Sequence, residues 1–281
     1  MRPSERESPE VDRSPPARRT LPLHPDNQGF AWRRLQPPHT LLTAAQVQSY
    51  DDNGYFLFEN AFQADELDRV AEAIAPFEAA LEAHLRTLEG GRLSIAKADA
   101  ITFTIHLVAK SETLRAFSRH PVLQGICHDI LGADARLYWD QAVYKKPGNP
   151  EEFPWHQDNG YTFVEPQQYL TCWIPLTDAT VENGCPWVVP GLHRLGTLKH
   201  EATPLGWQCL DHPEDAVPVP AKRGDIVVFS SLTPHRTGPN LTDAVRKAYI
   251  LQYAPDGASA KAPGRDQLTL QNDPARQYRV S

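Results

Sequence analysis

Residues 136–145 have the sequence RLYWDQAVYK and mark the point where the composition of the chain changes. Beyond it, short runs rich in Val, Tyr, Trp, Thr and Ile alternate with turns that contain Gly, Pro or Asn. Short strands that follow one another in this way are typical of an all-β sandwich or barrel. Further strands are predicted at residues 168–176, 186–189, 226–230 and 247–253.

The chain before these strands has helical patterns. Thr43 is a candidate N-cap, and Pro76 is expected to kink or split the second helix because proline lacks a backbone donor. Helices are predicted at residues 44–50, at 64–88 and, as a short pair, within 111–131, and a strand is predicted at 55–58. The expected fold is mostly β with supporting helices. A helical N-terminal layer runs to about residue 132, and the β core covers about residues 135–255.

The length and charge of the chain limit its class. Its 281 residues are enough for one large domain, which residues 39–281 are expected to form. Hydrophobic residues make up 41% of the chain, yet no apolar run reaches the roughly 18 residues that a membrane helix needs. The net charge of -7 argues against a general nucleic-acid binder. We therefore expect a globular monomer or homodimer without nucleic-acid or membrane partners.

Both ends of the chain lack periodic patterns. Residues 1–38 are rich in Pro, Arg and Ser and predict a disordered or loosely draped tail, and a second tail is expected after about residue 255. No apolar signal-peptide core is visible near the N-terminus. The cysteines form no C-x-x-C pair, which favours reduced thiols and a cytoplasmic protein. They are Cys127, Cys172, Cys185 and Cys209.

A candidate metal site lies in the sequence Trp155-His156-Gln157-Asp158. Residues i and i+2 of an extended segment point to the same side, so the His156 imidazole and the Asp158 carboxylate can reach one ion. His235, in a loop after the predicted strand at 226–230, is a candidate third ligand. Two His and one carboxylate leave three positions open on an octahedral ion, which is the facial triad of non-haem iron(II) oxygenases. Alone, the H-x-D pair also fits a surface His beside a solvated Asp.

Further motifs follow the H-x-D pair in order. They are E-N-G from Glu182, P-G-L-H ending at His193, G-D at 224–225, His235, and Arg246 eleven residues after it. Over about residues 41–255 this ensemble resembles the phytanoyl-CoA dioxygenase family, with Leu192 where the family usually has Ser. The resemblance implies a double-stranded β-helix (jelly-roll) fold and a dioxygenase that uses iron(II), 2-oxoglutarate and O₂.

The resemblance also implies roles for single residues. His156, Asp158 and His235 match the iron ligands and catalytic centre, and Arg246 matches the residue that pairs with the distal carboxylate of 2-oxoglutarate. A guanidinium suits that role because it presents two parallel N–H groups to a carboxylate. The residues that match further cosubstrate contacts are Thr237, Gln141 and Trp173. A Lys that some members place on an earlier strand has no clear match, and Phe103 or Thr104 stands near that point.

The primary substrate is expected to be a small molecule. The family includes hydroxylases of acyl-CoA, hydroxylases of small polar metabolites, and tailoring enzymes of natural-product pathways. A small metabolite or biosynthetic intermediate is the first expectation and an acyl-CoA the alternative, because Arg115, Arg119 and His120 form only a weak basic group. The pocket residues are expected to be Phe103, Thr104, His106, Asn159, Tyr161 and Trp187.

Three other functions are compatible with parts of the pattern. A related halogenase would need a small residue in place of Asp158. A zinc or other metal hydrolase on a cupin-like barrel would need neither Arg246 nor Thr237. A non-enzymatic metal-binding jelly-roll module would merely keep the fold.

Several other polar residues are expected to be structural or solvated. His106 and His193 are expected to be satisfied structural histidines rather than ligands. A surface position is expected for His128, His200 and His212, and Lys145 with Lys146 is expected at the solvated end of a strand.

Overall fold

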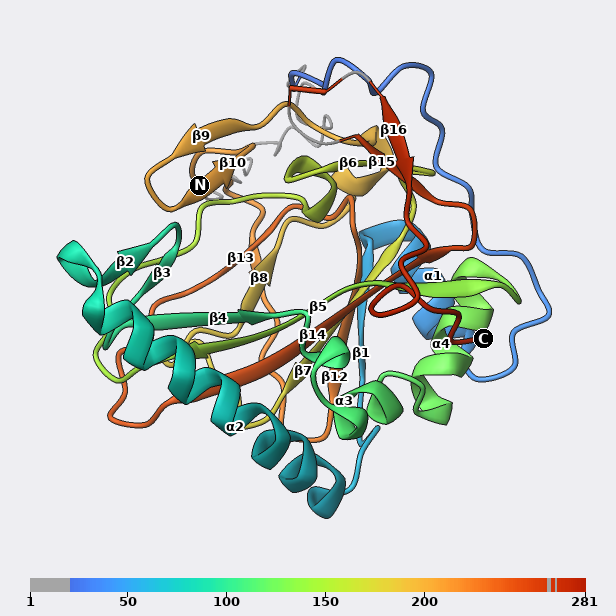
Figure 1. Ribbon diagram of the computed structural model, residues 1–281. Coiled ribbons are helices and arrows are strands. Elements are labelled where there is room, and N and C mark those ends of the chain that lie inside the picture. Colours follow the sequence, from blue (N-terminus) through green and yellow to red (C-terminus); the bar gives the residue numbers. More distant parts are fainter. Residues whose placement is uncertain (1–20, 262–263, 266) are drawn as a thin grey trace, which may run out of the picture.

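The protein is built around one antiparallel major sheet (Figure 1). The computed structural model describes residues 21–261, 264–265 and 267–281. The strand order of the major sheet is β1-β12-β7-β14-β5-β4-β3-β2. In chain order these strands are β1 (Tyr55–Phe58), β2 (Arg92–Leu93), β3 (Ala96–Lys97), β4 (Ile101–Ile105), β5 (Ala135–Lys145), β7 (Leu170–Pro175), β12 (Ile226–Ser230) and β14 (Arg246–Pro255).

A smaller sheet of β11, β8 and β13 faces the major sheet and closes the barrel interior. The first strands are β8 (Pro186–Val188) and β11 (Val217–Pro218), and the third is β13 (His235–Thr237). Val188 of β8 lies in one buried apolar cluster with Val143 of β5 and Phe229 of β12. Two sheets around a shared apolar interior form the expected jelly-roll core, and the mostly β fold is therefore confirmed.

The helices cover the other face of the major sheet. They are α1 (Ala44–Asn53), α2 (Ala64–Thr87), α3 (Glu112–Phe117) and α4 (Pro121–Leu131). Along β5, Ala142 and Tyr144 belong to the apolar cluster of these helices, whereas Val143 belongs to the barrel interior. This alternation follows from the two-residue period of a strand. No helix in the described part of the chain has both the length and the apolarity to cross a membrane.

The first two helices show where local sequence was decisive. Thr43 caps α1 as predicted, and the helix ends at Gly54, whose positive φ of 86° suits glycine. Helix α2 runs through Pro76 as one element, so of the predicted kink or split the split is wrong. Pro76 lies on the exposed face, where water can satisfy the carbonyl that loses its partner, while Leu67 and Ile74 hold the other face in the core.

The N-terminal strap, residues 21–38, packs on the barrel, so the expectation of a disordered tail is corrected for it. The Asn27 amide donates to the carbonyls of Leu195 and Thr197, both at 2.9 Å. The Trp32 indole donates to Asp51 at 3.1 Å and stands edge-on to the His193 ring at 4.4 Å. These anchors carry no periodic signal, which is why composition alone misassigned the strap. Residues 1–20 lie outside the described residues.

The described residues after 255 also pack on the barrel rather than leaving it as a tail. Strands β15 (Ser259–Lys261) and β16 (Leu268–Leu270) form a small sheet with β6 (Phe163–Glu165). The last residues then run beside the first half of β5, where Leu137 donates to the Tyr278 carbonyl at 3.1 Å. Strand β4 pairs only with the second half of β5, ending at Ile105 opposite Gln141. The C-terminal segment therefore occupies the edge that β4 leaves free.

Candidate metal and cosubstrate site

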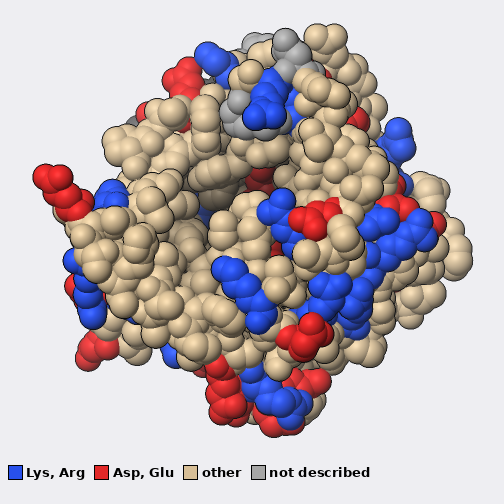
Figure 2. All heavy atoms as spheres, in the orientation of Figure 1, with Lys and Arg blue, Asp and Glu red and all other residues tan. Residues whose placement is uncertain are grey.

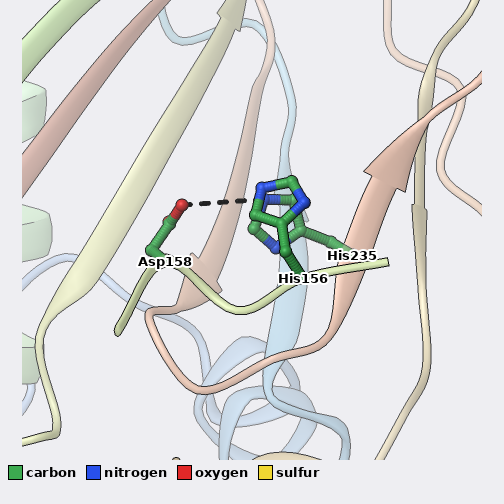
Figure 3. A group of neighbouring side chains, drawn as sticks. All are labelled: His156, Asp158 and His235. Atoms are coloured by element: carbon green, nitrogen blue, oxygen red, sulfur yellow. Dashed lines mark ion pairs between the residues drawn. The ribbon is translucent and has the colours of Figure 1, made fainter. Parts of the chain in front are cut away.

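Two separate segments bring the three predicted metal ligands together (Figure 3). His156 and His235 form a backbone bridge, with the amide of each donating to the carbonyl of the other at 3.0 and 2.8 Å. Asp158, two residues after His156, begins a short 3-10 turn, and its Oδ1 lies 3.7 Å from His235 Nε2. One ligand atom from each of the three residues lies within 4.8 Å of the others. The side chains thus converge on a space that one ion can fill.

The outer nitrogens of both imidazoles are fixed by backbone carbonyls. His156 Nδ1 lies 2.8 Å from the Pro154 carbonyl, and His235 Nδ1 lies 3.0 Å from the Thr233 carbonyl. A carbonyl can only accept, so each Nδ1 carries the proton and each Nε2 keeps its lone pair for the ion. The Thr171 hydroxyl donates to Asp158 Oδ2 at 2.5 Å, which orients the carboxylate in the same way.

The burial of the site sets the charge of its ligands. Burial, and next the neighbouring His235, lowers the pKa of His156 to about 3, and burial lowers the pKa of His235 to about 4. Burial raises the pKa of Asp158, while His156, the Thr171 hydroxyl and Gln252 oppose that shift. Two neutral imidazoles and one carboxylate are the donor set of the iron(II) facial triad, so the residues present fit this ion.

Sequence reasoning missed the residue between the two ligands of the H-x-D pair. Gln157 is fully buried, and its amide nitrogen donates to the carbonyls of Gly196 at 3.0 Å and Leu232 at 2.6 Å. It therefore ties the segment of His156 and Asp158 to the loop that precedes His235. No period or spacing signals this role. The one available signal is a long amide side chain between two candidate metal ligands.

His200 supports the same segment and is buried, which corrects the expected surface position. Its Nε2 accepts from the Gln157 backbone amide at 2.9 Å, and its Nδ1 donates to the Leu198 carbonyl at 2.9 Å. A Cβ at Gly160 would lie 2.1 Å from the His200 ring, so glycine is required there. Close packing of the His200 ring against Gly160 thus fixes the turn that carries Asp158.

Arg246 lies in the barrel interior as a buried cation without a partner anion. The residue is 1% exposed, and its guanidinium carbon lies 5.4 Å from the centroid of the Trp173 ring. Its Nε and Nη2 atoms have no hydrogen-bond partner among the described residues, and neither has the buried Oγ1 of Thr237. Burial lowers the pKa of Arg246 to about 10, so the side chain is still charged at neutral pH. Unsatisfied buried donors are costly, and a carboxylate would satisfy them.

Lys145 lies buried beside Arg246, which corrects its expected position at a solvated strand end. It is fully buried, and it is the Cα partner of Arg246 across β5 and β14. Its ammonium donates to the Thr237 carbonyl at 3.0 Å and to the Gly238 carbonyl. Burial, and next Arg246, lowers the pKa of Lys145 well below its usual range. The charged Arg246 and the amino group of Lys145 place buried hydrogen-bond donors at this end of the interior, which suits an anion.

Gln141 and Trp173 lie on the interior face of the sheet, between Arg246 with Lys145 and the metal ligands. Trp173 and Gln141 are both Cα partners of Ile250 on β14, so the three residues form one row across the sheet. Gln141 Oε1 accepts from the Trp139 indole at 3.3 Å. The four residues expected to bind 2-oxoglutarate, including Arg246 and Thr237, thus belong to strands that line one interior.

The expected substrate residues divide into two groups. Phe103 faces the interior, with its ring 5.1 Å from Phe153, and Tyr161 lies 5.2 Å from the His156 ring. His106 packs on Trp139 with ring centroids 4.3 Å apart. The structure brings these three to the walls or the rim of the barrel, where a substrate can reach them.

The other three expected substrate residues point elsewhere. Thr104 shares a face with Thr102, which bonds Glu78 of α2, so it lies on the helix side of the sheet. Asn159 is fully buried and uses its amide to bond Thr197 and the Val164 backbone, a structural role. Trp187 is the Cα partner of Arg236, on the face opposite to His235.

The interior opens to the face seen in Figure 2, which is hollowed near its centre with acidic and basic atoms visible at depth. A hairpin of β9 (Glu201–Thr203) and β10 (Gly206–Gln208) borders this opening in Figure 1. Its backbone at Trp207 bonds Tyr161, and burial raises the pKa of Tyr161 to about 12, so the phenol stays neutral. Tyr161 therefore links the hairpin to the ring of His156.

Comparison with known proteins agrees with this geometry. A family model described as phytanoyl-CoA dioxygenase (PhyH) matches residues 50–248. The phytanoyl-CoA dioxygenase domain-containing protein 1 of Danio rerio is 26% identical over 258 residues, covering 74% of this chain and 89% of that protein. A methylphosphonate hydroxylase of Gimesia maris is 28% identical over 223 residues, covering 76% of this chain and 82% of that protein.

A solved structure shares the fold. The non-haem α-ketoglutarate-dependent carbocyclase SnoK, from nogalamycin biosynthesis, aligns with a TM-score of 0.69 at 23% identity. The alignment covers 87% of this chain and 100% of that protein. At this identity the likeness supports the jelly-roll fold alone.

Proposed function

The chain belongs to the phytanoyl-CoA dioxygenase family of iron(II)- and 2-oxoglutarate-dependent oxygenases, and we propose that it oxidises an unactivated C–H bond of a small metabolite or biosynthetic intermediate. The observation that carries the proposal is the combination of a buried Arg246, whose Nε and Nη2 have no hydrogen-bond partner among the described residues, with a convergent His156, Asp158 and His235 set. Neither feature alone would distinguish an oxygenase from a plain metal-binding barrel.

In this proposal each residue has a defined task. His156, Asp158 and His235 hold the iron(II) ion on one face and leave three positions for other ligands. Arg246 and Thr237 bind the distal carboxylate of 2-oxoglutarate, which satisfies the buried donors that lack partners. When bound, the iron(II) ion with 2-oxoglutarate and O₂ supplies the oxidant for the C–H bond, and 2-oxoglutarate leaves as succinate and CO₂.

The protein also keeps water from the reacting atoms. The Phe229 ring lies 4.5 Å from the His235 ring, and the Tyr161 ring covers His156. Trp173 forms the wall under Arg246. These apolar surfaces strengthen the charge interactions of the site because they lower the local dielectric constant.

The alternatives are less well supported. Asp158 is present where a halogenase would have a small residue, and a hydrolase would have no use for Arg246. The basic residues considered for an acyl-CoA are already engaged, because the guanidinium groups of Arg115 and Arg119 lie 3.9 and 4.0 Å from the Tyr278 ring and bond backbone carbonyls. A small substrate also agrees with the Gimesia maris relative, which is named for methylphosphonate hydroxylation.

The proposal also covers the cellular location, the partners and the oligomeric state of the enzyme. Three of the four cysteines are buried and all four are free, which suits a reducing cytoplasm. The net charge of -7 is consistent with the absence of a nucleic-acid partner. A monomer or homodimer acting on a small molecule is the state we propose.

A direct assay tests the function. The purified protein should form succinate from 2-oxoglutarate with iron(II) but not with zinc, and should show a weak visible charge-transfer band when iron(II) and 2-oxoglutarate are added without oxygen. If a folded, metal-loaded protein showed neither succinate formation nor the visible band, the proposal would be wrong. Succinate formation above the substrate-free rate, measured across a metabolite collection, would then identify the substrate.

A further inference from the structure

We infer that Arg276, presented by the C-terminal segment at the rim of the barrel, recognises an oxyanion group on the primary substrate, a carboxylate or a phosphoryl group. The inference rests on the proposed function, because it assigns the substrate class for the same site. Four observations carry it: the anchoring of the segment, the position of Arg276 at a gap in the sheet edge, the orientation of its neighbours, and the donors that it leaves free.

The C-terminal segment is held firmly enough to position a side chain. Arg115 donates to the carbonyls of Pro274 and Ala275 at 3.0 and 2.8 Å. The ring of Tyr278 lies between two guanidinium groups and its hydroxyl bonds Ser118 at 2.7 Å. Arg276 therefore extends from a fixed backbone rather than from a loose end.

Arg276 lies where β4 ends and the C-terminal segment begins to cover β5. Its Nη1 lies 2.7 Å from Nε2 of His106, the residue that directly follows β4. His106 has a positive φ of 55°, a strained conformation for a residue with a side chain. The Asp140 carboxylate holds this turn by accepting from the amides of Leu107 and Val108. Strain that the surroundings enforce often marks a functional position.

The neighbours of Arg276 face the barrel interior. The His106 ring packs on Trp139, which shares the interior face of β5 with Gln141. Trp139 is the Cα partner of Gln252, and Gln252 bonds the metal ligand Asp158. A continuous wall thus leads from the metal ligands to Arg276.

The guanidinium keeps donors for a ligand. Its Nε donates to Asp273 at 3.0 Å and its Nη1 to His106, while Nη2 has no hydrogen bond to any residue in the described part of the chain. The side chain is 39% exposed, so a ligand can reach it. Burial, and next Arg276 itself, lowers the pKa of His106 to about 4, so His106 accepts from Arg276 and does not compete for an anion. A planar fork of this kind binds carboxylate and phosphoryl oxygens well.

Apolar and aromatic side chains lie beside Arg276 at the rim. Trp139 lies next to the gap, and Ile105, 39% exposed, ends β4 beside it. A ligand with an apolar body and one anionic end suits this surface. The anionic end would be fixed at the rim while the body places a C–H bond near the metal ligands.

The test compares acids with their neutral esters. The probes are short- and medium-chain carboxylic and alkylphosphonic acids, each paired with its methyl ester. Two measurements are made on the full-length protein: succinate formation above the substrate-free rate, and anaerobic equilibrium binding followed by tryptophan fluorescence. The wild-type protein should favour at least one acid over its ester, and Arg276→Gln should reduce that ratio roughly 10- to 100-fold. The ratio is taken within each variant, so a general loss of activity cancels.

Two further variants make the outcome decisive. Arg276→Lys should retain part of the preference, because it keeps the charge but not the fork. Arg279→Gln is the matched control, since Arg279 lies in the same segment but pairs with Asp134 and Asp256. Its acid-to-ester ratio should equal that of the wild type. Equal behaviour of acids and esters in the wild type, including no response to either, overturns the inference. Absence of substrate-free succinate formation would instead count against the proposed function.

Discussion

The two ends of the barrel interior differ in how their polar groups are satisfied. At the metal end, each imidazole has its outer nitrogen fixed by a backbone carbonyl, and the carboxylate accepts from Thr171. At the end proposed to bind 2-oxoglutarate, Arg246 and Thr237 have buried atoms without a hydrogen-bond partner in the described part of the chain. The first end presents fixed lone pairs to an ion, whereas the second presents buried donors that would bind an anion in the proposed function. Preorganisation thus takes two forms in one interior: fixed lone pairs at one end and unsatisfied donors at the other.

The largest effect is expected from removing a metal ligand. His235→Ala leaves two of the three ligands, so iron(II) affinity should fall by more than the roughly 10- to 100-fold that loss of an outer hydrogen-bond partner costs. The measurement is metal content and the anaerobic visible band. His212→Ala is the control, because that side chain is 96% exposed. Full iron binding by His235→Ala would mean that the ion is held elsewhere.

Removing the buried guanidinium should affect 2-oxoglutarate binding and iron binding to different extents. Arg246→Ala should weaken 2-oxoglutarate binding by about 2–5 kcal/mol, or roughly 30- to 5,000-fold, while iron binding changes far less. Arg246→Lys should recover part of the loss, since an ammonium cannot form the parallel fork. Titration of the visible band with 2-oxoglutarate measures both. An unchanged apparent affinity in Arg246→Ala would show that another residue holds the carboxylate.

A substitution of Lys145 tests whether this buried residue contributes to 2-oxoglutarate binding. Lys145→Met removes the donor of the Thr237 and Gly238 carbonyls, so the free energy of unfolding should fall by about 2–3 kcal/mol. The affinity for 2-oxoglutarate should also fall, but less than in Arg246→Ala. Lys146→Met is the matched control, because Lys146 pairs with Glu78 on the helix side. Equal effects of the two substitutions on 2-oxoglutarate affinity would remove Lys145 from the pocket.

The smallest effect on 2-oxoglutarate affinity is expected from removing the Thr237 hydroxyl. Thr237→Ala should weaken 2-oxoglutarate binding by about 1.5 kcal/mol, which corresponds to one lost hydrogen bond to a charged group. Thr87→Ala, at the exposed end of α2, should leave the affinity unchanged. The ranking is the claim to be tested: a larger loss at Thr237 than at Arg246 would reverse the assignment of the anion-binding residue.

The local sequence determined more of the metal end than of the cosubstrate end. His156 and Asp158 are two residues apart, so extended geometry alone places both on one side. The row of Trp173, Ile250 and Gln141 depends on the register of three strands. That register follows from long-range packing, and a shift of one residue would turn each side chain to the other face. Family resemblance supplied these residues where local pattern could not.

What the sequence by itself determined was the β core, the helical layer, the cap of α1 and the candidate triad, because these depend on residue type, period and short spacing. Only the tertiary structure decided that Lys145 and His200 are buried, that Gln157 ties the ligand loops together, and that Arg276 meets His106 across 170 residues. It also decided that the N-terminal strap and the C-terminal segment pack on the barrel. The physical reason is that burial and charge pairing are set by contacts between distant segments, whose approach no local period encodes.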